Sequence, residues 1–126
     1  MEPKTIFCDI DGCILEHGVT GVSDCWSYYD EDSDLKPITL PGVKEKFDEW
    51  CTNHFRVILV TGRPECMRQD TIYRLQMIKG VWWNQLVMDV GHGPRYLIND
   101  MKENDTKLSA FAINIKRNAG LKDVEV

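Results

Sequence analysis

Residues 4–12 read KTIFCDIDG, and this stretch decides the fold. Its first part is a short apolar run that is typical of a buried β-strand. The run ends in two aspartates, Asp9 and Asp11, with one residue between them, and Gly12 follows at once. A pair of acids at the end of a buried strand is the first indication of a functional site.

Strand and helix patterns alternate along the rest of the chain. Apolar residues recur at helical spacing from Val43 and again after Pro64, which suits the first turn of a helix. Continuous apolar runs predict further strands, covered on both faces, at 55–60, 85–90 and 95–99. A weakly alternating stretch at 110–115 predicts a last strand, with a helix as the alternative. The alternation predicts an α/β fold: one Rossmann-like three-layer domain over residues 1–126, with a mostly parallel sheet and helices on both faces.

The composition narrows the classes of function. Of the 126 residues, 43% are apolar and 28% are charged, which is ordinary for a soluble globular domain. No apolar run reaches the length of about 18 residues that a membrane span requires. Acidic residues outnumber basic ones by 20 to 15, so the basic footprint of a nucleic-acid-binding protein is absent.

The cysteines and the N-terminus indicate a cytoplasmic protein. The first residues lack the apolar core of a signal peptide. The five cysteines contain no C-x-x-C pair, and their number is odd, so we expect reduced thiols. These cysteines are Cys8, Cys13, Cys25, Cys51 and Cys66.

Polar side chains follow three of the predicted strands. Asp9 and Asp11 end the first, Thr61 follows the second, and Asp100 follows the strand predicted at 95–99. Ligands of open α/β sheets bind outside the carboxyl ends of the strands, so we expect these residues in one crevice. Three acids in one place repel each other, and Mg²⁺, which prefers oxygen ligands, removes that cost.

Magnesium beside a carboxylate indicates phosphoryl transfer. One carboxylate can attack phosphorus to form an aspartyl-phosphate, while a second acid protonates the leaving oxygen and later deprotonates water. The Thr61 hydroxyl and the Gly62 N–H could hold phosphate oxygens, helped by the N-terminus of the helix after Pro64. Thr61 could instead cap that helix, and Arg63 could touch the substrate or lie on the surface.

The chain resembles the haloacid dehalogenase-like (HAD) hydrolases. The matching stretches are FCDIDGC at 7–13, VTGR at 60–63 and LINDMKEND at 97–105. The resemblance implies that Asp9 is the nucleophile and that Asp11 is the general acid and base, with its backbone carbonyl also on the metal. It further implies that Thr61 binds a phosphoryl oxygen and that Asp100 is a magnesium ligand.

Some positions match this family less directly. For the cation that steadies nucleophile and phosphate, Arg95 is our first choice, and Lys79 and Lys102 are the alternatives. Asp105 lies where the family has a second acid, but it could also cap a helical turn. His92 could line the entrance of the site.

The family's cap insertions, which choose the substrate, have no room in this chain. Only about 50 residues separate Asp11 from Thr61, and the helix from Val43 uses part of them. We therefore expect an open site, with residues 13–40 as a small flap and no full cap domain. The resemblance implies that relatives without a cap often act on large substrates or complete the site with a neighbouring subunit. The sequence is therefore also compatible with a homo-oligomer.

These observations predict a magnesium-dependent phosphomonoester hydrolase that acts on a phosphorylated sugar or another small metabolite. One alternative is a non-catalytic binding or regulatory domain of the same fold. Another is a phosphatase or phosphotransferase for nucleotides or nucleic-acid ends. No cysteine is followed six positions later by an arginine, and no G-x-x-x-x-G-K-[ST] loop occurs, which argues against a cysteine phosphatase and an ATP-binding phosphate loop.

Overall fold

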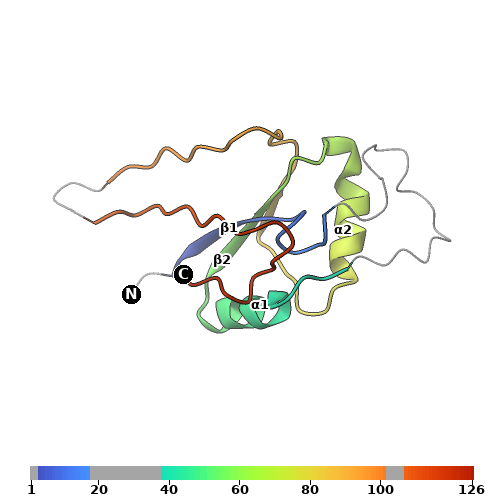
Figure 1. Cartoon of the computed structure of the whole chain (residues 1–126), viewed down its shortest axis with the longest axis horizontal. Coiled ribbons are helices and arrows are strands. Elements are labelled where there is room, and N and C mark those ends of the chain that lie inside the picture. The colour runs from blue at the N-terminus through green and yellow to red at the C-terminus, as the bar shows by residue number, and fades with distance from the viewer. Residues whose placement is uncertain (1–2, 18–37, 102–106) are drawn as a thin grey trace.

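The computed structural model describes residues 3–17, 38–101 and 107–126 (Figure 1). Its elements in chain order are β1 (Thr5–Asp9), α1 (Val43–Thr52), β2 (Arg56–Val60), the 3-10 helix η1 (Glu65–Met67), α2 (Arg68–Gln76) and β3 (Gln85–Val87). Among the described helices, none has the length and apolar character needed to cross a membrane.

The three strands form one parallel sheet in the order β1-β2-β3. Parallel neighbours need a crossover connection, and here the chain returns through α1 and then through η1 and α2. The predicted α/β fold with parallel pairing is therefore confirmed. The register pairs Asp9 with Val60, so the end of β1 lies beside the loop that begins at Thr61.

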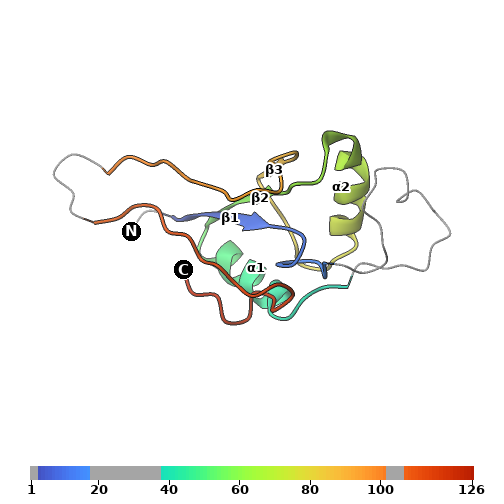
Figure 2. The same ribbon diagram turned by 45° about the horizontal axis from the view of Figure 1, so that its top comes forward.

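The residues buried on one face of the sheet belong to a core cluster that also includes residues of both helices. Cys8, Val57 and Leu59 are buried on that face, and α1 packs below it (Figure 2). The helical residues in the same cluster are Val43, Phe47 and Trp50 of α1 and Leu75 of α2. Phe7, which points to the opposite face, is 56% exposed.

The C-terminal turn is anchored where α1 begins. The Leu121 N–H donates to the Pro41 carbonyl at 2.8 Å. Gly42 has a φ of +79°, and a side chain there would overlap the backbone of Lys122, so this position needs glycine. The anchor fixes the course of the segment that precedes it, which reaches the carboxyl end of β1.

Two strand predictions are wrong. Residues 95–99 and 110–115 form no strand; they belong to two extended segments, 94–101 and 107–115, that run side by side away from the sheet (Figures 1 and 2). The side chains of Tyr96 and Ile98 are 89% and 96% exposed. An apolar run favours extended backbone, but it does not show that a neighbouring strand is available for pairing. The strand predicted at 85–90 ends at Val87.

The predicted flap at 13–40 lies mostly outside the described residues. Its described ends meet: the Glu16 N–H donates to the Ile38 carbonyl at 2.9 Å, and the Leu40 N–H donates to the Ile14 carbonyl at 2.9 Å. The two ends of the flap segment therefore leave the domain close together. The single-domain organisation stays a prediction.

The expectation that all five cysteines are reduced is wrong at Cys66. Cys8, Cys13 and Cys51 are free thiols, whereas Cys66 of η1 is disulfide-bonded. Cys25 lies outside the described residues. Spacing along the chain cannot reveal such a bond, because the pairing is decided by which sulfur atoms the fold brings together.

Candidate functional site

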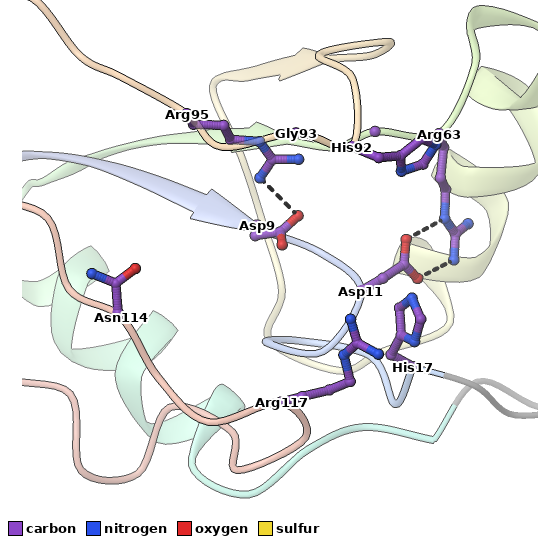
Figure 3. Close-up of a pocket in the computed structure, with 10 residues that line it drawn as sticks. Asp9, Asp11, His17, Arg63, His92, Gly93, Arg95, Asn114 and Arg117 are labelled. Atoms are coloured by element: carbon purple, nitrogen blue, oxygen red, sulfur yellow. Dashed lines mark hydrogen bonds and ion pairs between the residues drawn. The ribbon is translucent and has the colours of Figure 1, made fainter.

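A pocket of about 390 Å³ lies beyond the carboxyl end of β1 (Figure 3). Side chains from four parts of the chain meet there: the end of β1 and its following loop, the loop after β2, residues 92–95, and residues 114–117. The lining residues are Asp9, Asp11, His17, Gly62, Arg63, His92, Gly93, Arg95, Asn114 and Arg117. The sheet edge expected to carry the site is therefore the edge that carries the pocket.

Asp9 is the last residue of β1 and faces this pocket. One carboxylate oxygen, Oδ1, accepts a hydrogen bond from the Ile10 N–H at 2.9 Å. The same oxygen lies 3.5 Å from Nη1 of Arg95, and the Asp9 side chain is 37% exposed. The carboxylate is thus held by its own backbone and by one guanidinium, while the remaining side is open.

Asp11 is turned toward Arg63. The guanidinium donates to both carboxylate oxygens, from Nε at 2.8 Å and from Nη2 at 2.7 Å. Arg63 also donates from Nη1 to the buried hydroxyl of Thr71 in α2, at 3.1 Å. Such a two-pronged pair is geometrically specific. The sequence allowed either a substrate contact or a surface position for Arg63. Its side chain lies in the pocket.

Thr61 and Gly62 shape the loop after β2. Thr61 is 1% exposed, is not a lining residue, and its hydroxyl accepts a hydrogen bond from the Arg63 N–H at 3.1 Å. The N-cap of η1 is Pro64, without a side-chain cap, so the alternative in which Thr61 caps that helix is not what is observed. A side chain at Gly62 would lie 2.8 Å from the Gly91 carbonyl oxygen, so glycine permits the close approach of that loop.

The three acids expected to share a magnesium ion do not meet. Asp9 and Asp11 line the pocket, but Asp100 is exposed on the extended segment 94–101. Within the described residues, no group of three or more His, Cys, Asp or Glu side chains is placed to hold a metal ion. In the pocket, each of the two carboxylates faces a guanidinium, and Asp100 is not among the lining residues.

The structure distinguishes between two of the three candidates for the phosphate-binding cation. Arg95 lies in the pocket beside Asp9, whereas Lys79 is exposed and lies elsewhere. Lys102 and the second family acid, Asp105, fall outside the described residues. His92 lines the pocket, as the sequence suggested.

Sequence reasoning missed four lining residues: His17, Gly93, Asn114 and Arg117. No motif marks them, because two of them lie roughly a hundred residues along the chain from Asp9 and Asp11 and reach the pocket only through the C-terminal anchor. With Arg117 included, three guanidinium groups face two carboxylates in the pocket. On a chain with a net charge of −5, this local excess of positive charge favours an anionic ligand.

The thiols near the pocket are not suited to nucleophilic attack. Burial raises the pKa of the Cys13 thiol to about 11, and the negative charge of Asp9 adds to the shift. Burial also raises the pKa of Cys8 far above its ordinary range. The thiolate is the reactive form of cysteine, so neither thiol is a good nucleophile near neutral pH.

This assignment predicts the order of alkylation. At pH 8, iodoacetamide should modify the exposed Cys51 well before Cys13. A pKa of 11 in place of the ordinary 9.0 leaves about a hundredfold less thiolate. The modification of Cys13 should accelerate as the pH rises toward 11. Peptide mass spectrometry against time measures both rates, and equal rates at pH 8 would contradict the assignment.

Comparisons with protein-family models, with curated proteins and with solved structures found no match. The chemistry of this pocket is therefore inferred from its own residues.

Proposed function

We propose that this chain is a phosphomonoester hydrolase of the haloacid dehalogenase-like type that acts on a small phosphorylated metabolite, such as a phosphorylated sugar. The observation that carries the proposal is the open carboxylate of Asp9 beside Arg95, in a pocket with more guanidinium than carboxylate groups. A phosphoryl group needs a nucleophile and charge-assisted hydrogen bonds to its oxygens. Both are supplied at this edge of the sheet.

In the proposed reaction, an Asp9 oxygen attacks phosphorus. Asp11, which takes up a proton from water once the substrate has displaced it from Arg63, gives that proton to the ester oxygen as the bond from phosphorus to this oxygen breaks. Water then attacks the aspartyl-phosphate as Asp11 takes its proton. The bond between phosphorus and the Asp9 oxygen breaks, which releases inorganic phosphate and restores the carboxylate.

The Arg63 guanidinium binds Asp11 at 2.7 and 2.8 Å, so the substrate must also displace Asp11 from Arg63 before proton transfer. A phosphate oxygen competes for the same guanidinium, since arginine binds phosphate and carboxylate with the same fork of donors. Binding of the substrate thereby releases Asp11 for proton transfer. Arg95 and the Gly62 N–H hold the other phosphoryl oxygens.

The proposal also includes the complete fold of the domain and its metal ion. We propose one Rossmann-like three-layer domain around the observed sheet of three parallel strands and its two helices. Magnesium would balance charge on the phosphoryl group when bound. Its predicted ligands Asp9, Asp11 and Asp100 are not brought together here, so magnesium dependence rests on the sequence motifs.

We also propose a cytoplasmic location for this chain. A cytoplasmic location was expected from reduced cysteines, and the disulfide at Cys66 weakens that reasoning. The acidic net charge argues against nucleic acid as the substrate.

Hydrolysis of a panel of phosphate esters tests the function. We expect the purified chain to release inorganic phosphate from para-nitrophenyl phosphate and from phosphorylated sugars in the presence of Mg²⁺. EDTA should abolish the release, and added Mg²⁺ should restore it. Full activity in EDTA would refute the metal requirement but not the hydrolase. Release from no ester would favour the non-catalytic binding domain, and transfer to an added alcohol would identify a phosphotransferase.

A further inference from the structure

Arg117 reaches the pocket from a segment that no sequence motif marks. In Figure 3 its side chain rises from the C-terminal segment toward Asp11 and His17, on the side of the pocket away from Arg95. Both Arg117 and His17 are lining residues. The pocket therefore has one cation beside Asp9 and another at the opposite wall.

The position of Arg117 is set by its neighbour Asn118. The Asn118 side chain accepts a hydrogen bond from the His17 N–H at 2.8 Å and donates to the His17 carbonyl at 3.1 Å. The Asn118 N–H donates to the Gly12 carbonyl at 2.9 Å. Three hydrogen bonds thus join the loop after β1 to the C-terminal segment, and Arg117 is presented to the pocket by a fixed turn.

Arg117 differs from the other two arginines of the pocket in its bonding. Arg63 is paired with Asp11 and Arg95 with Asp9, whereas Arg117 has no hydrogen bond or ion pair with any residue in the described ranges. Asp9 and Asp11 already have guanidinium partners. An anion from outside the protein is the natural partner for the third cation.

We propose that Arg117 and His17 form a second anion subsite, and that the ligand of this pocket carries two negatively charged groups, as a sugar bisphosphate or a phosphorylated sugar acid does. One phosphoryl group lies against Asp9 and Arg95, and the second anion lies against Arg117. The pocket volume of about 390 Å³ is within the range of about 300–1,000 Å³ that small-molecule sites have. As a statement about the substrate, this inference rests on the proposed function.

Paired ligands test the subsite by binding, separately from turnover. Glucose 1,6-bisphosphate and glucose 6-phosphate are titrated calorimetrically into protein carrying Asp9→Asn, which prevents consumption of the ligand. We expect the bisphosphate to bind about tenfold more tightly, as one additional charge-assisted contact provides. Adding Arg117→Gln should reduce the ratio of the two affinities to near one.

Two further variants make the result specific. Lys116→Gln removes a neighbouring charge that does not line the pocket, and it should leave the ratio unchanged. Arg117→Lys keeps the charge and should keep part of the preference. Equal affinity for the two ligands with Arg117 present, or a preference that survives Arg117→Gln, would overturn the inference.

The outcome is distinguishable from that of the proposed function. If the bisphosphate binds through Arg117 but the unaltered chain hydrolyses no ester, the two-anion ligand stands and the hydrolase fails. If esters are hydrolysed without any preference for a second anion, the hydrolase stands and the subsite fails.

Discussion

Asp9→Asn protein should lose phosphomonoesterase activity by at least about a thousandfold, because an amide cannot form the aspartyl-phosphate. The change is nearly isosteric. The amide oxygen can still accept the hydrogen bond that the Ile10 N–H makes at 2.9 Å, so the end of β1 should keep its geometry. Release of inorganic phosphate under single-turnover conditions, with enzyme in excess, measures the loss at the chemical step.

Asp48→Asn is the matched control for this experiment. Asp48 lies on the outer side of α1, where it pairs with Lys44 at 2.8 Å and is more than half exposed. The same chemical change there should leave activity unaltered and stability nearly so, since surface ion pairs contribute little. If Asp9→Asn protein turned over at the parent rate, or if both variants lost activity equally, Asp9 would not be the nucleophile.

Phe47→Ala should lower the free energy of unfolding by about 3–5 kcal/mol. Phe47 is fully buried, and its ring centroid lies 5.1 Å from that of Trp50 and 6.1 Å from that of Trp82. Its backbone carbonyl accepts a hydrogen bond from the Trp82 indole at 3.1 Å. Truncation leaves a cavity between α1 and the sheet that these rigid rings cannot fill.

Urea denaturation monitored by tryptophan fluorescence measures this loss. Tyr73→Ala is the control, because the Tyr73 side chain on α2 is 64% exposed; it should change stability by no more than about 0.5 kcal/mol. A loss below about 1 kcal/mol for Phe47→Ala would mean that the core is not built around this ring. Unchanged activity per folded molecule would show that the core supports the pocket without taking part in its chemistry.

The metal is the point at which motif and geometry disagree. The late acid of the motif, Asp100, lies on a segment whose apolar side chains are largely exposed. The acids at the sheet edge meet arginines instead of a third carboxylate. The EDTA experiment therefore tests the motif, whereas Asp9→Asn tests the nucleophile that motif and geometry share.

Local sequence patterns correctly predicted the elements that have a strong apolar run or a strong helical periodicity. β1, β2 and the start of α1 lie where the apolar runs and the helical spacing from Val43 place them, because these signals act over a few residues. The stretches at 95–99 and 110–115 were also predicted to be strands, yet they form none. Pairing depends on what lies beside a segment in space, and a run of side chains does not contain that information.

The parallel α/β plan and the position of Asp9 and Asp11 at the end of the first strand could be read from the chain alone, since both follow from chain order and residue type. Only the tertiary structure decided that Arg63 holds Asp11, that Arg95 approaches Asp9, and that Arg117 closes the far wall. Contacts between distant segments depend on the anchor at Pro41 and Leu121 and on the Asn118 hydrogen bonds. These contacts arise only after the sheet has formed, so no local pattern encodes them.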